Sequence, residues 1–463
     1  MRALHNISLV KVLTLVAVGG IAAFLFFAGK NYLDSPSSTL APASAKPKSK
    51  LGKASVVLLQ SADESFEPFQ ESAEAGLKAA LNTLNDRLKS GGNTQSPIAF
   101  DIDTYFVRST TAPEIAAELT SKLDIENLSL LVVADSESFT SAALAAADKI
   151  KIPIFYLLDG PCKTFVAADR PSPYIWGLGF SDEILVEPLF ITLNDQLGKP
   201  DLDLSMLLVG ADSEESRAKV EFAKETAEDL GFKILETRFT DTRITDYYTF
   251  IRDLFASAPT VLFLNNPGKP GVLFVQQAGK LSLTKEMSLI GINTFDAENV
   301  REMGEAAERA VTIGRYPTGL KSAEHNEFLA ALGLDSPSTI SQDEKAEKTA
   351  ASAKPTILPS ETTMGAYVSL LMVDAAMRKA GSTANEKWLA AMDDLEILGP
   401  TGRILADSDN HIFHQPLFVS LVSKGGYKIV EALGESSNPR NEGCLLKDSA
   451  AEIDSPPAEQ PNS

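Results

Sequence analysis

The stretch Gly399-Pro400-Thr401-Gly402-Arg403-Ile404 is the most informative part of this chain. The polar residues Asp409-Asn410-His411 follow it, then Gln415-Pro416 and the run Gly425-Gly426-Tyr427-Lys428-Ile429-Val430. Neighbouring proline and glycine favour a turn, and the apolar residues that come after favour short strands. No catalytic motif accounts for this order of residues, so the stretch tells more about the fold than about a reaction.

Upstream of this stretch, strand-like and helix-like segments alternate. The strand-like segments are mostly continuous apolar runs: Ser55–Leu59, Phe100–Val107, Leu128–Ala134, Ile152–Leu158, Leu204–Gly210, Lys233–Phe239, Thr260–Leu264 and Met287–Gly291. The segments with helical periodicity are Phe69–Leu88, Pro113–Leu123, Ser138–Lys149, Ile184–Gln196, Ser213–Leu230, Tyr247–Phe255, Val272–Leu281 and Met364–Lys379. This alternation predicts parallel sheets that helices cover on both faces. Because the pattern restarts after Pro173, we expect two similar α/β lobes.

Composition excludes several classes of protein. The chain has 463 residues and a formal net charge of −20, with 44% hydrophobic residues. It is long enough for two lobes with separate cores. The acidic balance argues against nucleic acid and anionic lipid surfaces as partners. The two cysteines, Cys162 and Cys444, are too few for a disulfide framework or a zinc cluster.

The N-terminal region predicts export. Residues 12–29 are uncharged and apolar, near the minimum length for a membrane-spanning helix, with Arg2 and Lys11 before them. We expect a transmembrane signal anchor over residues 8–30 and a flexible linker over 31–53. A cleaved signal peptide is the alternative, since Ala43-Ser44-Ala45 has the form of a cleavage site. No second apolar run of this length follows, which argues against a polytopic transporter.

Motifs for catalysis or metal binding are weak. His411 and His414 stand close to Asp407, but residues three apart in a strand point to opposite faces. The chain has no phosphate-binding loop and no nucleophile elbow, and it has only four histidines to serve as a base. We therefore expect neither an enzyme nor a cofactor or metal site.

The order of several motifs resembles type I periplasmic solute-binding proteins, the group that binds leucine, isoleucine and valine, amides or urea for ABC importers. The opening turn Gly399–Gly402 is similar to that family's G-P-T-G turn before the last crossover between lobes. Other matching motifs are Val132-Val133-Ala134-Asp135-Ser136-Glu137-Ser138, Ile152-Pro153-Ile154-Phe155, Pro173-Tyr174-Ile175-Trp176, Asp246-Tyr247-Tyr248-Thr249, and Ala375–Gly381 followed by Ser382-Thr383. The resemblance implies two doubly wound parallel-sheet lobes joined by three crossovers.

The resemblance also implies boundaries. Lobe 1 is expected at residues 54–178 and 316–404, and lobe 2 at 179–314 and 405–433. Residues 335–360 are expected to form a polar insert, and residues 434–463 a disordered acidic tail.

The family places its ligand between the lobes, and the resemblance implies the contacts. Ser136 and Ser138 of the first lobe would bind a carboxylate or amide. The other candidate ligand-binding residues are Asp159, Gly160, Glu215, Asn266 and Asn293. The chain departs from the family pattern in two places. The threonine expected near Asp159 and Gly160 is absent, and Ala211-Asp212-Ser213 replaces a tyrosine-glycine pair. Asp159 or Glu215 could replace the usual partner of an amino-acid ammonium group, whereas the asparagines favour a neutral amide or urea-like solute.

These observations predict an extracytoplasmic protein, anchored to the inner membrane, that captures a small polar solute such as an amino acid, an amide or a urea-like compound. The permease and ATPase of the importer would be separate chains, since this chain carries no nucleotide motif. The alternative is a membrane-anchored envelope scaffold or regulator that has the same fold and a degenerate ligand pocket.

Overall fold

The computed structural model describes residues 52–89, 98–159, 172–179, 182–197, 204–241, 243–317, 319–334, 359–408, 411–424 and 426–435. The expected anchor at residues 8–30, Cys162 and Cys444 lie outside these residues, as do almost all of the expected linker, polar insert and acidic tail. Within the described part of the chain, none of the helices has both the length and the apolar character needed to span a bilayer.

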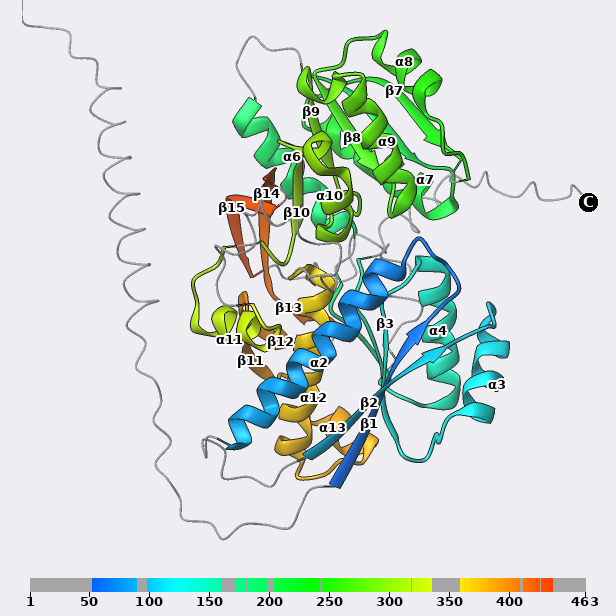
Figure 1. Cartoon of the computed structure of the whole chain (residues 1–463), viewed down its shortest axis with the longest axis vertical. Coiled ribbons are helices and arrows are strands. Elements are labelled where there is room, and N and C mark those ends of the chain that lie inside the picture. Colours follow the sequence, from blue (N-terminus) through cyan, green and yellow to red (C-terminus); the bar gives the residue numbers. More distant parts are fainter. Residues whose placement is uncertain are drawn as a thin grey trace, which may run out of the picture. The chain divides into compact units, whose positions relative to one another are not determined.

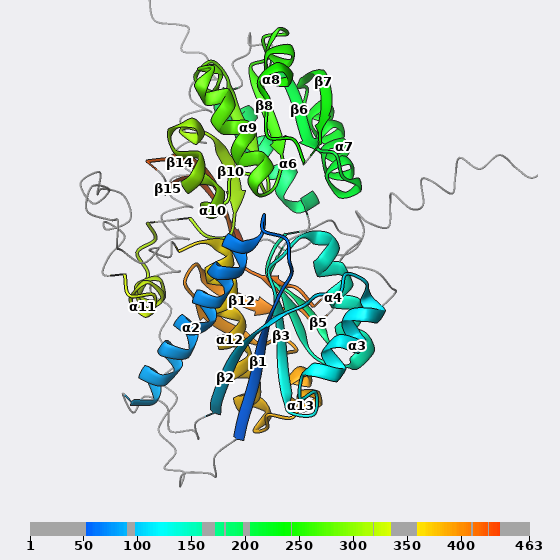
Figure 2. The same cartoon turned by 45° about the vertical axis from the view of Figure 1, so that its right-hand side comes forward.

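The first sheet is parallel, and its central strands are buried on both faces. Its strand order is β2-β1-β3-β4-β5. The strands are β1 (Gly52–Gln60), β2 (Ile98–Phe106), β3 (Leu128–Val133), β4 (Ile154–Tyr156) and β5 (Ile175–Gly177). Helices α3 (Ala112–Lys122) and α4 (Glu137–Ile150) cover one face, and α2 (Glu67–Lys89) covers the other (Figures 1 and 2). All six residues of β3 are buried, as expected for a strand that is covered on both sides.

A second sheet follows in the chain, with strand order β15-β14-β10-β9-β8-β6-β7. Its parallel strands are β6 (Ser205–Ala211), β7 (Lys233–Thr240), β8 (Val261–Asn265), β9 (Ser288–Gly291) and β10 (Val311–Gly314). Strands β14 (Pro416–Ser423) and β15 (Gly426–Glu435) add an antiparallel edge. Its helices are α6 (Asp182–Leu197), α7 (Glu214–Asp229), α8 (Tyr248–Phe255), α9 (Lys269–Lys280) and α10 (Ala297–Met303).

After β10 the chain returns to the first lobe through three helices: α11 (Ala323–Ala331), α12 (Glu361–Ala380) and α13 (Asn385–Ala390). Helix α12 lies beside α2 (Figure 1) and is buried on nearly all sides. Gly76 of α2 permits this close packing, because a Cβ atom there would lie 2.1 Å from the carbonyl oxygen of Thr363. The close packing of α12 against α2 therefore depends on a residue without a side chain in α2.

Three predicted boundaries shift slightly. Strand β1 begins at Gly52, inside the expected linker, because it pairs with β2 from that residue onward. Ser360 was expected to end the polar insert but caps α12 instead, since its Oγ accepts the Thr363 N–H at 3.1 Å. Strand β15 likewise continues to Glu435, two residues into the expected tail. In each case backbone pairing or capping orders residues that composition alone assigns to a loop.

The stretch that begins at Gly399 forms a hairpin. Strand β11 (Glu396–Gly399) turns through Pro400 and Thr401 into β12 (Gly402–Ala406), and β13 (Phe413–His414) pairs with β12. Gly402 has φ of 127°, a conformation that favours glycine. Ile404, Ala406 and Phe413 belong to the core of the first lobe. The hairpin thus remains with the first lobe, and the chain crosses to β14 later than residue 405, where the sequence predicts it.

The three crossings between the sheets meet at one carbonyl group. The first crossing follows β5, the second follows β10, and the third precedes β14. The Leu178 carbonyl oxygen of the first crossing accepts hydrogen bonds from Arg315 Nη1 of the second crossing and from Gln415 Nε2 of the third, the latter at 2.8 Å. Arg315 Nη2 also donates to the Leu157 carbonyl oxygen at 2.9 Å. Arg315 is 1% exposed, so its charge is buried in this hinge.

Replacing Arg315 with methionine tests the hinge. Arg315→Met removes the described donor to the Leu157 carbonyl and one of the two donors to the Leu178 carbonyl, and it removes the positive charge next to Asp159 and Glu361. We expect a loss of about 3–5 kcal/mol in the free energy of unfolding, measured by urea denaturation of the full chain. The exposed Arg252 of α8 offers a control, since Arg252→Gln is expected to change stability by less than about 0.5 kcal/mol. Equal stability of the two variants would contradict this role.

Candidate ligand-binding site

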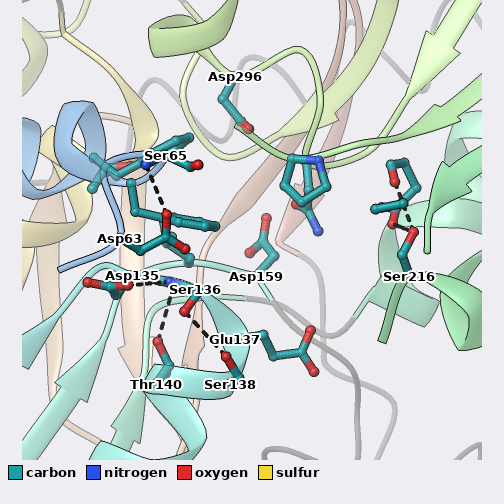
Figure 3. Close-up of a pocket in the computed structure, with 18 of the residues that line it drawn as sticks. Asp63, Ser65, Asp135, Ser136, Glu137, Ser138, Thr140, Asp159, Ser216 and Asp296 are labelled. Carbon is teal, nitrogen blue, oxygen red and sulfur yellow. Dashed lines mark hydrogen bonds between the residues drawn. The ribbon is translucent and has the colours of Figure 1, made fainter. Parts of the chain in front are cut away.

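A cavity of about 450 Å³ lies between the two lobes. Residues of the first sheet and its helices form one wall, and loops that follow the second sheet's strands form the other (Figure 3). This position is typical of ligand sites in α/β proteins, because loops at the carboxyl ends of parallel strands carry polar groups that are not used in the sheet.

The first-lobe wall is organised by Asp135 at the end of β3. This side chain is 2% exposed. Its carboxylate accepts hydrogen bonds from Ser61 Oγ at 2.8 Å, Gln70 Nε2 at 2.6 Å and the Ser136 N–H at 2.7 Å. Burial raises the pKa of Asp135, and these hydrogen bonds act in the opposite direction. Ser136 caps α4 by accepting the Phe139 N–H at 3.4 Å. Asp135 and Ser136 therefore satisfy donors at the start of α4 that a ligand anion would otherwise use.

A group of carboxylates surrounds Arg315 at the floor of the cavity. Arg315 lies 3.5 Å from Asp159 and 3.2 Å from Glu361. Asp296 and Glu298 of the second lobe also line the cavity. Burial raises the pKa of Glu361 to about 7 although Arg315 lowers it, and burial also raises the pKa of Glu298. One guanidinium therefore neutralises only part of the negative charge of four carboxylates.

Asp296 is the least satisfied of these groups. Among the described residues its carboxylate has no hydrogen-bond or salt-bridge partner, and its side chain does not cap α10. Burial, followed by repulsion from Glu298, Glu361 and Asp159, raises its pKa well above the ordinary value. Asp296 and Asp159 reach toward the same space from opposite lobes (Figure 3). The cavity thus places two carboxylates opposite each other without a described cation between them.

The second-lobe wall is built from α7 and the loop after β8. Ser216 Oγ donates toward Asn265, whose Oδ1 lies at 2.8 Å. Lys219 of α7 lies 3.2 Å from Glu137 of α4, and both side chains are largely buried. This ion pair joins the two lobes at the cavity, so part of the cavity wall depends on how the lobes meet.

The structure places four of the sequence-predicted site residues in the cavity lining: Ser136, Ser138, Asp159 and Asn293. Asn293 has φ of 55°, a left-handed conformation that asparagine tolerates and that is found often at binding sites. Gly160 lies outside the described residues. Glu215 belongs to the first turn of α7, but its side chain is not among the groups that the structure describes.

Asn266 lies behind the cavity wall. It is fully buried, its N–H donates to Thr294 Oγ1 at 2.9 Å, and its Nδ2 donates to Thr240 Oγ1 at 3.3 Å. Asn265 lines the cavity in its place. Strand β8 ends at Asn265, and a shift of one residue decides which asparagine reaches the cavity.

Sequence reasoning missed Asp296, Glu298, Arg315, Glu361 and Lys219. Glu361 follows the polar insert directly, and nothing in its local sequence relates it to a cleft. Asp296 follows β9 at the carboxyl end of a parallel strand, which is the one signal that could have found it.

The two histidines near Asp407 serve other contacts. His414 Nε2 lies 2.7 Å from Asp407 Oδ2, while His411 stacks on Trp176 with ring centroids 4.3 Å apart. In the described part of the chain, no cluster of histidine, cysteine and acidic residues has the arrangement of a metal site.

Comparison with known proteins identifies the fold family. The sequence matches the family described as periplasmic binding protein over residues 54–427. The chain belongs to the periplasmic binding protein family. This match confirms the resemblance inferred from the motifs. A comparison with curated proteins finds no match.

Several solved structures of this family share the fold. A solute-binding protein of an ABC transporter from R. palustris, in complex with 4-hydroxybenzoate, has a TM-score of 0.66 and 18% identity, with 84% of this chain and 98% of that chain covered. An isoleucine-bound substrate-binding protein of a branched-chain amino acid transporter from Streptococcus pneumoniae has a TM-score of 0.62 and 18% identity, with coverage of 84% and 99%. A leucine-binding protein from Thermotoga maritima has a TM-score of 0.62 and 15% identity, with coverage of 82% and 98%.

The raised pKa of Glu361 predicts a pH effect on stability. A carboxyl group whose folded pKa lies above its unfolded pKa stabilises the fold while it is protonated, and this contribution is lost as pH rises through about 4.5 to about 7. Glu361→Gln removes that titration. We expect the free energy of unfolding of the variant, relative to that of the unmodified chain, to rise by about 2 kcal/mol between about pH 5 and about pH 8. This value is reduced for solvent screening, because a quarter of the Glu361 side chain is exposed.

Urea denaturation at both pH values measures this difference. The exposed Glu386 of α13 provides the control variant Glu386→Gln, whose stability relative to the unmodified chain is expected to stay constant. If the stability of Glu361→Gln relative to the unmodified chain instead falls as the pH rises, the prediction is contradicted. That result would show that Arg315 keeps Glu361 ionised across this pH range.

Proposed function

We propose that this protein is an extracytoplasmic solute-binding protein that captures a small polar solute and presents it to an ABC importer. The observation that supports this proposal is the cavity of about 450 Å³, lined by many polar side chains, between the lobes of a periplasmic binding protein fold. Its size suits a ligand of amino-acid or small aromatic dimensions. The bound ligands of similar structures, 4-hydroxybenzoate and isoleucine, support this size range.

The proposed ligand contacts come from both lobes. Ser136, Ser138 and Asp159 would contact the solute from the first lobe, and Asn293 from the second. Gly160 comes directly after Asp159 in the chain, and Glu215 directly precedes Ser216 of the cavity lining, so both remain proposed contacts. Asn266, buried next to Asn265, would support the wall from behind. Binding between two lobes joined at a hinge suits closure around a solute, because each lobe supplies part of the contact surface.

The importer's permease and ATPase are proposed to be separate chains, and the binding domain is proposed to lie in the periplasm. Residues 8–30 would anchor it to the inner membrane, because an uncharged run near eighteen residues can span the hydrocarbon core. A solute-free envelope scaffold with the same fold is the competing proposal. The absence of the threonine that the family has near Asp159 and Gly160 favours this scaffold.

A thermal-shift screen distinguishes these functions. The full chain in detergent is mixed with millimolar amino acids, amides, urea-like compounds, aromatic acids and amines. A ligand at a hundred times its Kd is expected to raise the melting temperature by about 3–5 °C. Ser138→Ala is expected to weaken binding of the hit about fivefold, and Ser121→Ala on the exposed face of α3 is the matched control. No shift with any compound would contradict solute binding.

Membrane fractionation tests the anchor. The full chain is expected to sediment with inner membranes and to need detergent for release. Ile21→Arg places a charge in the apolar run and costs about 2.5–3.5 kcal/mol of insertion free energy, so a larger soluble fraction is expected. Val132→Ile, a substitution in the buried strand β3, is not expected to change the distribution. Recovery of a shortened chain that begins after Ala45 in the soluble periplasmic fraction would instead establish a cleaved signal.

A further inference from the structure

We propose that the solute carries a positively charged nitrogen and no free carboxylate, and that Asp159 and Asp296 hold this nitrogen from opposite lobes. The inference rests on the proposed solute-binding function and specifies the chemical class of the ligand. It would be an organic amine or guanidinium compound, in contrast to the neutral amide or urea-like solute that the asparagines of the sequence favour.

The first argument is the charge of the cavity. Among the residues that the structure describes, seven carboxylate side chains line it, against two cationic side chains. The cationic groups are Lys219 and Arg315, and the carboxylates are Asp63, Asp135, Glu137, Asp159, Asp296, Glu298 and Glu361. Both cations already lie beside carboxylates, Lys219 near Glu137 and Arg315 near Asp159 and Glu361. A ligand anion would therefore be repelled, while a cation would reduce the cost of the buried negative charge.

The second argument is the unsatisfied carboxylate of Asp296. No described residue supplies it with a hydrogen bond or a salt bridge, although it is removed from bulk water far enough for burial to raise its pKa. An ionised carboxylate in such a position is costly unless a donor approaches. Asp159 faces the same space from the first lobe (Figure 3), and its side chain is 8% exposed. A ligand ammonium between them would provide charge-assisted hydrogen bonds to both.

The third argument is the lack of a carboxylate subsite at the start of α4. A helix N-terminus normally offers N–H groups to an anion. Here the Ser136 N–H donates to the Asp135 carboxylate and the Phe139 N–H donates to Ser136 Oγ. Glu137 adds another negative group next to them. A ligand carboxylate would meet two acidic side chains there, Asp135 and Glu137, which disfavours an α-amino acid.

The remaining wall suits the carbon skeleton of an organic cation. Phe66 and Phe69 line the cavity with their ring centroids 5.7 Å apart, and the ring of Tyr156 is also in the lining. Aromatic faces attract cations and cover apolar groups. A hydrated metal ion would use none of these surfaces, so the lining favours an organic ligand.

Cation binding is coupled to protonation. The groups that face Asp296 are Glu298 of α10, Glu361 of α12, Asp159 after β4, Arg315 after β10 and Tyr427 of β15. Burial raises the pKa of Asp296, Glu298 and Glu361, and a bound cation would lower it. Protons would therefore be released on binding, and affinity for the amine is expected to increase from about pH 6 to about pH 8.

Matched ligand pairs test the proposal by isothermal titration calorimetry of the full chain in detergent. Agmatine and arginine differ by a carboxylate, and 4-hydroxybenzylamine and 4-hydroxybenzoate differ in the sign of their charge. In at least one pair the amine is expected to bind about a hundredfold more tightly, or about 2.7 kcal/mol. Titration in two buffers of different ionisation enthalpy should show proton release. Calcium and magnesium salts are titrated alone as a separate arm.

Asp159→Asn and Asp296→Asn are each expected to weaken amine binding at least about tenfold, since each removes one charged acceptor. Asp101→Asn on β2 and Asp253→Asn on α8 replace exposed aspartates of the same two lobes and are expected to leave it unchanged. The comparison of ligand pairs uses the unmodified chain, so it decides the question even if a variant does not fold.

Other outcomes overturn the inference in distinguishable ways. Equal or tighter binding of the carboxylate member in both pairs, or binding of the metal ions alone, would refute the charge preference and leave solute binding intact. Binding only of neutral amides or of amino acids would do the same. No heat and no thermal shift with any compound would refute the solute-binding function and the inference together.

Discussion

The Leu178 carbonyl and the Arg315 guanidinium are the point on which the two-lobed architecture depends. All three crossings of the chain meet there, because Arg315 and Gln415 both donate to the Leu178 oxygen. A guanidinium can do this since its donors form a rigid planar fork, so one side chain reaches Leu178, Leu157 and Glu361 together. The geometry of the hinge and the floor of the cavity are thus set by the same side chain.

That arrangement has an electrostatic consequence for the cleft. A buried arginine needs carboxylate partners, and Asp159 and Glu361 supply them. Asp296 and Glu298 add negative charge that Arg315 does not neutralise. The hinge therefore brings a surplus of acidic groups to the place where a solute would enter. These residues would serve the hinge and the proposed binding site together, so a substitution that changes the pocket's charge is also expected to affect how the lobes meet.

Much of the fold could be predicted because its physical cause is local. Continuous apolar runs such as Leu128–Val133 indicate strands covered on both faces, and helical periodicity between them indicates parallel sheets. The motifs around Gly399 and Ser136 identified the family. The exact place of the last crossing was missed, because Ile404 and Phe413 join the first core through contacts that no local pattern records.

Sequence by itself determined the alternation of elements and the family, since periodicity and turn motifs act over a few residues. Only the tertiary structure decided which polar residues share the cavity. Asp159, Asp296 and Glu361 are far apart in the chain, and they meet because the crossings converge on Arg315. The choice of Asn265 over Asn266 likewise depends on the strand's orientation in the sheet. The charge of the cleft is therefore a property of residues brought together by the hinge.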